Sequence, residues 1–300
     1  MNQRHLSRLV PCLVLVAAVA GCGRDTPPAK KDVPPPQRIV SLVPAVTEML
    51  FAIGAGPRLI AVSSFDHWPP EVAKLTRVGG LLDPDIERIL SLKPDLLVAD
   101  ASQAEVVLKA KAAGIRVFPY TLGGLDNLTR TMRELGRVVG TVDQAEAAAA
   151  AVDQRLDAIR KRVAGLPRPR TMLVFGREPG ALRAIDVSGG VGFLHDIVQL
   201  SGGDNVFGNE KREWVRVSVE NVVAAAPEVI IELHYGYYLK PQRLKTEMAV
   251  WNTLTTVPAV RNHRVHLFEG DKFVVPGPRL VEAAEDIAAV IHPTAVGGRR

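Results

Sequence analysis

Short apolar runs alternate with segments of helical pattern along most of this 300-residue chain. The predicted strands are Ile39–Leu42, Leu59–Val62, Leu96–Ala99, Ile115–Phe118, Met172–Phe175, Val229–Leu233 and Arg264–Phe268. The predicted helices between them are Thr47–Ile53, Ile86–Leu92, Ala104–Ala113, Gly192–Leu200, Val219–Ala225 and Pro278–Ile291. Such alternation predicts an α/β fold with parallel sheets.

The longest helical pattern lies between the two groups of strands. It begins near Asp143, a candidate cap, and continues through the alanine-rich run Ala147–Ala151 to Val163. A helix of about 22 residues would span roughly 33 Å, the width of a small domain. The pattern therefore favours two Rossmann-like lobes joined by one long rigid helix, although an ordinary surface helix would also fit.

A weak internal repeat supports two similar halves. Glu87 lies seven residues before Pro94, which an acid and an apolar strand follow. Glu220 lies at the same distance before Pro227, again followed by an acid and a strand. Because the two segments occupy corresponding points of two α/β halves, the repeat predicts lobes with matched surface features.

The first residues have the pattern of an export signal. Arg4 and Arg8 precede the apolar stretch Leu9–Ala20, which is too short for an ordinary transmembrane helix. Small residues then lead to Cys22, as in the lipobox of bacterial lipoproteins. We expect Cys22 to become the lipidated N-terminus, although a plain secretory signal with an incidental cysteine is the alternative.

The segment after Cys22 is rich in proline and lysine up to Gln37 and predicts a semi-extended tether. The other cysteine, Cys12, lies inside the predicted leader, so the mature chain would hold no disulfide. Gly23 is not the aspartate that usually retains lipoproteins at the inner membrane. We therefore expect membrane anchoring on the periplasmic or cell-surface side.

Composition is that of an ordinary globular protein, with 47% hydrophobic and 23% charged residues. The net charge of +5 includes two arginines of the predicted leader and is too small to indicate nucleic-acid binding. The sequence contains no Walker A loop, no Gly-x-Ser-x-Gly elbow and no His-Glu-x-x-His motif. We expect no enzyme activity, no catalytic cofactor and no metal site.

From Arg38 onward the sequence resembles the periplasmic cobalamin-binding proteins of ABC importers, which belong to the helical-backbone class of substrate-binding proteins. The resemblance covers roughly residues 38–292. It rests on the segments Arg38–Glu48, Ser63–Phe65, Trp68–Pro70, Ile86–Ile89, Leu92–Leu96, Gly202–Phe207, Ser218–Glu220 and Pro278–Arg279, and on Trp214. These motifs are typical of a class that carries cobalamin, ferric siderophores and haem.

The resemblance implies a ligand cleft between the two lobes and a monomer that delivers its ligand to a membrane permease driven by a separate ATPase. It also implies that Glu87 and Glu220, one on each lobe, dock onto arginines of the permease. Paired charges at two separated points fix orientation and speed encounter. Without the resemblance, each glutamate would be read as a favourable acid in the first turn of its helix.

Aromatic walls with a few polar groups suit a large planar ligand. The resemblance places Phe65, Trp214 and Asp271 at the ligand, and Trp68 is either wall or core. Tyr235, with Tyr237 and Tyr238, follows a predicted strand and would face the crevice at its carboxyl end. We therefore expect Phe65, Trp68, Trp214, Tyr235 and Asp271 to bind the ligand.

The sequence departs from the cobalamin pattern at Leu81 and Asp100, where that family often has tryptophans. One alternative keeps the fold and changes the ligand to a ferric siderophore or haem, with Arg177, Arg183 and Arg212 lining the cleft. A second is a surface lipoprotein with a sensing or scaffold role and no transporter.

The predicted organisation divides the chain into a leader, a tether, two lobes, the helix that joins them and a tail. The ranges are 1–21 for the leader, 22–37 for the tether, 38–142 for the N-terminal lobe, 143–166 for the joining helix, 167–293 for the C-terminal lobe and 294–300 for the tail.

Overall fold

The computed structural model describes residues 34–236 and 240–296. The chain divides into the units Met1–Pro34 and Pro35–Arg300, and the second contains every described element of secondary structure. The leader, nearly all of the tether, Cys22, Tyr237 and Tyr238 lie outside the described residues. The predicted boundaries of the leader, tether and lobes stay predictions.

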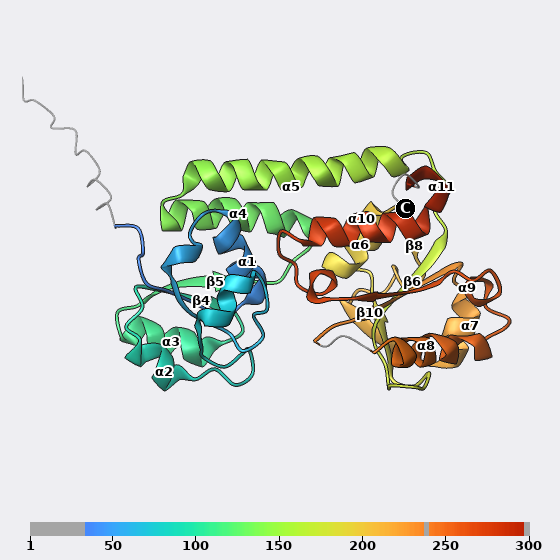
Figure 1. The fold of residues 1–300 in the computed structure, drawn as a ribbon, viewed down its shortest axis with the longest axis horizontal. Coiled ribbons are helices and arrows are strands. Elements are labelled where there is room, and N and C mark those ends of the chain that lie inside the picture. Colours follow the sequence, from blue (N-terminus) through green and yellow to red (C-terminus); the bar gives the residue numbers. More distant parts are fainter. Residues whose placement is uncertain (1–33, 237–239, 297–300) are drawn as a thin grey trace, which may run out of the picture. The chain divides into compact units, whose positions relative to one another are not determined.

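The N-terminal lobe is built around a parallel five-stranded sheet in the order β3-β2-β1-β4-β5 (Figure 1). Its strands are β1 (Ile39–Ser41), β2 (Leu59–Val62), β3 (Thr76–Arg77), β4 (Leu96–Asp100) and β5 (Arg116–Tyr120). Its helices are α1 (Pro44–Ala52), α2 (Ile86–Ser91) and α3 (Ala104–Ala112), with 3-10 turns at Gly56–Arg58 and Pro70–Lys74. The central strands β1 and β4 are almost wholly buried because helices cover both faces of the sheet.

The C-terminal lobe has a six-stranded sheet in the order β11-β10-β6-β7-β9, with β8 also paired to β6. Its strands are β6 (Arg170–Gly176), β7 (Ile185–Ser188), β8 (Asp204–Asn205), β9 (Trp214–Val217), β10 (Val229–His234) and β11 (Val265–Glu269). Its helices are α6 (Phe193–Leu200), α7 (Val219–Ala225), α8 (Pro241–Ala249), α9 (Pro258–Arg261), α10 (Leu280–Ile291) and α11 (Pro293–Val296), with 3-10 turns at Val250–Thr253 and Asp271–Phe273.

The expected α/β fold class is confirmed, and the C-terminal sheet differs from it in one respect. Strand β7 runs antiparallel to both of its neighbours, β6 and β9, so this sheet is mixed rather than wholly parallel. The chain from β6 to β7 crosses only a short loop, residues 177–184, which is too short for a parallel crossover.

Two helices run side by side between the sheet-forming halves of the chain: α4 (Leu125–Val139) and α5 (Val142–Val163) (Figure 1). Helix α5 lies where the sequence predicted the long helix, and α4 was not anticipated. Gly140, with φ of 72°, makes the tight turn between them in a conformation that most other residues avoid.

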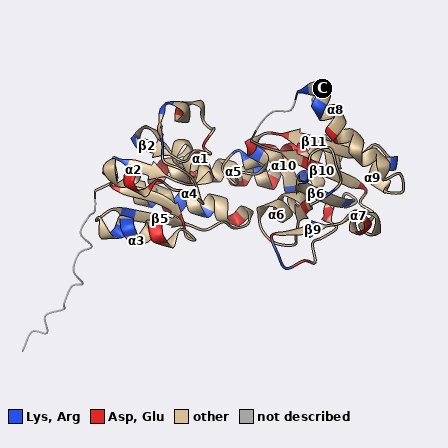
Figure 2. Cartoon of the chain, turned by 90° about the horizontal axis from the view of Figure 1, so that it is seen from below, with Lys and Arg blue, Asp and Glu red and all other residues tan. Residues whose placement is uncertain are grey.

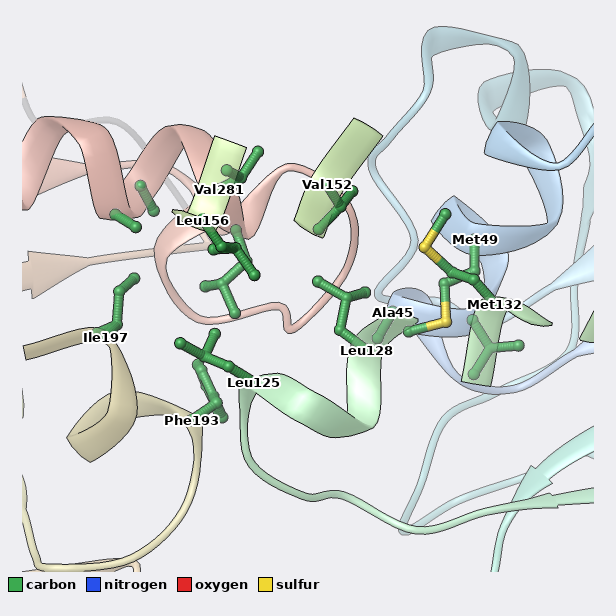
Figure 3. Close-up of a cluster of buried hydrophobic side chains, with 14 of the residues drawn as sticks. Ala45, Met49, Leu125, Leu128, Met132, Val152, Leu156, Phe193, Ile197 and Val281 are labelled. Atoms are coloured by element: carbon green, nitrogen blue, oxygen red, sulfur yellow. The ribbon is translucent and has the colours of Figure 1, made fainter. Parts of the chain in front are cut away.

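A layer of apolar side chains joins these helices to both lobes. Figure 3 shows residues from α1, α4, α5, α6 and α10 in one buried cluster. The labelled members are Ala45, Met49, Leu125, Leu128, Met132, Val152, Leu156, Phe193, Ile197 and Val281. Because this layer is continuous, the two lobes share one core beneath α4 and α5, which limits how far either can move.

The predicted internal repeat is a repeated structural unit. In the first half α2 leads through Lys93, with φ of 50°, and Pro94 into β4; in the second half α7 leads through Ala226, with φ of 42°, and Pro227 into β10. Arg38 donates hydrogen bonds to the carbonyl oxygens of Leu92 and Lys93.

The hydrogen bonds of the second unit match those of the first. Arg170 donates to the carbonyl oxygen of Ala225, as Arg38 does to the end of α2. The acid after each proline, Asp95 or Glu228, accepts from the backbone N–H of the same arginine. Glu87 and Glu220 therefore occupy equivalent positions by the hydrogen bonds of the two units as well as by their spacing in the sequence.

Candidate functional site

The loop after β2 carries two exposed aromatic side chains on the N-terminal lobe. Phe65 is 62% exposed and Trp68 is 45% exposed. The Arg77 guanidinium holds this loop by donating to the carbonyl oxygens of Ser63 and Asp66, both at 2.8 Å. Exposed aromatic rings on a fixed loop suit contact with a ligand or a partner better than core packing.

Asp66 lies beneath this loop and accepts a hydrogen bond of 2.8 Å from the backbone N–H of Ser63. Its side chain is almost fully buried. Burial raises the pKa of the Asp66 carboxyl above its ordinary value of 3.8, and hydrogen bonds from Thr47 and Ser63 and the charge of Arg77 offset this only in part. The folded protein therefore binds a proton at Asp66 more tightly than the unfolded chain does.

We expect Asp66→Asn to stabilise the protein at pH 8, since asparagine keeps an acceptor for Ser63 and removes the buried charge. The benefit should shrink as the pH falls through the raised pKa towards 3.8, because wild-type Asp66 then also becomes neutral. A gain of about 1 kcal/mol would raise the unfolding midpoint by about 2–4 °C. Thermal unfolding at pH 8 and pH 4 measures this; a variant less stable than wild type at pH 8 would contradict it.

The C-terminal lobe contains a cavity of about 280 Å³ with mostly apolar walls. The residues that line it are Phe175, Val191, Gly192, Phe193, Leu194, Glu213, Trp214, Tyr235 and Val274. Trp214 opens β9 and is 50% exposed, whereas Tyr235 directly follows β10 and is 47% exposed. The structure thus brings two of the predicted ligand residues to one cavity.

The other predicted ligand residues lie outside this cavity. Asp271 accepts a hydrogen bond of 3.3 Å from the backbone N–H of Gly236, which holds it beside the Tyr235 loop. Phe65 and Trp68 belong to the other lobe and contribute nothing to the cavity lining. Of the two departures from the family pattern, Leu81 is half exposed, and the Asp100 carboxylate accepts hydrogen bonds from Ser102.

Glu213 is the one charged residue in the cavity lining. Within the described parts of the chain its carboxylate has no ion-pair partner, and its backbone carbonyl accepts from Gly189. A carboxylate at an apolar cavity favours a ligand that brings hydrogen-bond donors or positive charge, and disfavours an anionic one.

Arg177, one of the arginines considered for an anionic ligand, is instead part of a buried ion-pair network. Its guanidinium lies 2.9 Å from both the Glu232 and the Glu247 carboxylates, and all three side chains are at most 4% exposed. Glu232 also accepts hydrogen bonds from Trp251 at 2.6 Å and His234 at 2.8 Å. Arg177 is therefore committed to holding the lobe together.

The charge state of Glu232 fits this structural role. Burial alone would raise its pKa, but the hydrogen bonds from His234 and Trp251 and the charge of Arg177 outweigh burial and hold the pKa below its ordinary value.

Of the remaining arginines considered, Arg183 pairs with Glu178 at the surface, whereas Arg212 is exposed beside Glu213.

Glu87 and Glu220 occupy the same place in the two repeated units, the second residue of α2 and of α7. Both are exposed, and in the part of the chain that the structure describes neither forms an ion pair. The helix caps are other residues: Asp85 accepts from the N–H of Arg88, and Ser218 forms a capping box with Asn221. Neither glutamate is the N-cap residue, although each suits the first turn of a helix and the Glu220 carboxylate accepts from Ser218 and from its own backbone N–H.

The pKa of Glu220 is lowered, mainly by its hydrogen bond with the Ser218 side chain, so this carboxylate is ionised at neutral pH. Figure 2 shows basic and acidic residues mixed over α2 and α3. Glu87 thus stands as a local negative charge on a mixed surface rather than as part of a large acidic patch.

Residues 34–236 and 240–296 contain no helix that is long and apolar enough to cross a membrane. Within the same ranges no group of three or more His, Cys, Asp or Glu side chains is arranged to hold a metal ion.

Comparison with known proteins identifies the family of this chain. Residues 39–271 match the family model described as periplasmic binding protein. A protein named vitamin B12-binding protein from Pectobacterium carotovorum subsp. carotovorum (strain PC1) is 30% identical over 266 residues, which cover 87% of this chain and 91% of the relative.

Solved structures show the same fold. The periplasmic vitamin B12-binding protein of Vibrio cholerae has a TM-score of 0.75 at 25% identity and covers 88% of this chain and 99% of its own. A periplasmic haem-binding protein from Pseudomonas aeruginosa has a TM-score of 0.75 at 24% identity, covering 86% and 94%. With its two α/β lobes and the family match over residues 39–271, the chain belongs to the periplasmic binding proteins, the solute-binding components of ABC importers.

Proposed function

We propose that this protein captures a corrinoid, cobalamin in the first place, and delivers it to a membrane permease driven by a separate ATPase. The observation that carries the proposal is the cavity that Trp214 and Tyr235 line together with Phe175 and Phe193. Aromatic side chains can cover one face of a large planar ligand, although a cavity of about 280 Å³ would hold only part of a corrinoid. Relatives whose matches cover 85–87% of this chain are named vitamin B12-binding proteins.

Charge at the cavity favours the same ligand class. Its one charged lining residue is acidic, and Arg177 is withdrawn into a buried network. A corrin carries many neutral amide groups that donate hydrogen bonds, which a carboxylate such as Glu213 accepts. Haem and the catecholate or carboxylate siderophores carry anionic groups that free arginines would bind well. The exposed Arg212 is the cation that keeps such ligands as the second candidate.

Calorimetric titration of the full chain in mild detergent tests the ligand, with cyanocobalamin set against haem and a ferric siderophore. Tight one-to-one binding of cyanocobalamin is the expected result. Tight binding of a comparator alone would overturn the corrinoid assignment and leave the transport role standing. Failure of all three to bind would favour a surface protein with a sensing or scaffold role.

We further propose that Cys22 is lipidated and anchors the protein to a membrane on the periplasmic or cell-surface side, with residues 22–37 as the tether. The protein would then act as a monomer without a catalytic cofactor. We expect Cys22→Ser to move the protein from the membrane fraction to the soluble fraction after cell lysis, with Cys12→Ser as the matched control. Retention of the Cys22 variant in the membrane fraction would contradict the anchor.

A further inference from the structure

Arg279 of the C-terminal lobe is held between two residues of the N-terminal lobe. Its guanidinium makes a bidentate ion pair with Glu48 of α1, with distances of 2.5 Å from Nη2 and 3.1 Å from Nε. The same guanidinium lies over the Trp68 ring, 4.8 Å from the ring centroid. We name Glu48, Arg279 and Trp68 the interlobe clasp.

The clasp is tightly enclosed. The Glu48 side chain is 4% exposed and that of Arg279 is 19% exposed. Gly277 also packs against Glu48: a β-carbon at Gly277 would lie 2.6 Å from the Glu48 carboxylate. Since no side chain fits at Gly277 without displacing Glu48, the backbone before α10 is shaped around this ion pair.

Apolar packing surrounds the clasp. Ala45 and Met49 of α1, the helix that carries Glu48, belong to the shared apolar cluster, and so does Val281 of α10 (Figure 3). The ion pair therefore lies where the cores of the two lobes meet, and it fixes their relative position at one further point besides α4 and α5.

The clasp fixes the relative position of the two lobes more than it adds to the free energy of unfolding. Burial raises the pKa of Glu48 above its ordinary value of 4.5 in spite of Arg279, and the nearby Asp66 adds to this effect. A buried pair of this kind adds little net stability, but opening it leaves an uncompensated charge, which costs much more. The contact therefore opposes separation of the lobes without needing to strengthen the fold.

Trp68 connects the clasp to the proposed ligand wall. Its indole ring faces the guanidinium, yet 45% of the residue remains exposed, next to the exposed Phe65. Cation–π contact holds an indole ring in a defined orientation. Removing Arg279 would remove this contact and leave the orientation of the ring less restricted.

We propose that Arg279 is a positioning residue that sets the orientation of Trp68 towards the ligand and, through Glu48, the spacing of the two lobes around it. The proposal rests on the proposed function in one respect, since it assumes that the ligand contacts Trp68. Ligand affinity then depends on Arg279 of the C-terminal lobe, which acts through Trp68 of the N-terminal lobe.

Binding kinetics of the full chain with cyanocobalamin test the positioning role. Arg279→Gln should weaken binding about 10-fold, mainly through faster dissociation, and Arg279→Lys should recover only part of this because it loses the bidentate geometry. The loss caused by Arg279→Gln should largely disappear when Trp68 is already alanine, since the two residues act as a unit. Equal losses in both backgrounds, or unchanged binding, would overturn the proposal.

Hydrogen exchange without ligand separates failure of this inference from failure of the proposed function. We expect Arg279→Gln to speed exchange in residues 63–69 and 275–279 while the strands of both sheets stay protected. A purely structural role would instead raise exchange throughout. Glu48→Gln, which keeps the shape and removes the charge, is the second variant if Arg279→Gln does not fold, and unchanged exchange in both loops would contradict the clasp whatever the ligand proves to be.

Discussion

Replacing Trp214 with alanine should raise the Kd for cyanocobalamin roughly 30- to 150-fold, a loss of about 2–3 kcal/mol. The ring is half exposed at the cavity, so it is free to cover a ligand face that would otherwise stay in water. Aromatic residues in well-packed pockets commonly dominate binding in this way. Calorimetric titration of variant and wild-type protein under identical conditions measures the change.

Two further variants decide how the result is read. Trp214→Phe keeps an aromatic ring and should fall between wild type and alanine. Leu108→Ala, on the exposed face of α3 and 68% exposed, removes a comparable exposed apolar side chain away from the cavity and should leave the affinity unchanged. An alanine variant at position 214 that binds cyanocobalamin within about twofold of wild type, a margin well below the expected loss, would remove Trp214 from the ligand wall.

The central strands of each sheet were predictable because a strand that is buried on both faces has a continuous run of apolar residues. The matched helix-to-strand units at Glu87 and Glu220 were also readable, since the prolines and acids fix their spacing. Helix α4 was missed although its apolar residues Leu125, Leu128 and Met132 recur at helical intervals. The helical pattern of α4 is therefore present in the sequence, with polar residues between its apolar positions.

Strands β7 and β9 were harder to predict because a charged residue, Asp186 or Arg216, interrupts the apolar pattern of each short strand. Their register depends on sheet contacts rather than on local pattern. Trp214 could be singled out as an aromatic residue but not as the start of an edge strand.

At the candidate site, the sequence could suggest which aromatic residues bind the ligand, but it could not show which charged side chains form ion pairs with one another. Trp214 and Tyr235, both predicted from the sequence to bind the ligand, line one cavity. Arg177 was a plausible ligand residue until the fold brought Glu232 and Glu247 to it. Glu48 and Arg279 are 231 residues apart, so their ion pair has no local signature. Electrostatic partners of this kind are set by tertiary structure alone.

Reversing the charge at both repeated units, Glu87→Lys with Glu220→Lys, should abolish ligand delivery to the permease while leaving ligand affinity unchanged. Both carboxylates are exposed on helices away from the cavity lining, and within the described residues neither has an ion pair to lose. If they dock onto arginines, reversal replaces two attractions with two repulsions. Each single reversal should lower delivery about 10-fold, and the double variant at least about 100-fold. Uptake of labelled cobalamin by cells that depend on this protein measures delivery.

The double variant needs a control with the same change in net charge. Glu71→Lys with Glu210→Lys reverses one exposed acid in each lobe outside the repeated units and should leave delivery near wild type. If the control pair lowers delivery as much as the Glu87 and Glu220 pair, the effect belongs to overall charge rather than to two docking points. If delivery survives the reversal of Glu87 and Glu220, their equivalence in the two lobes reflects only the repeated helix-to-strand unit, and the permease must recognise another surface.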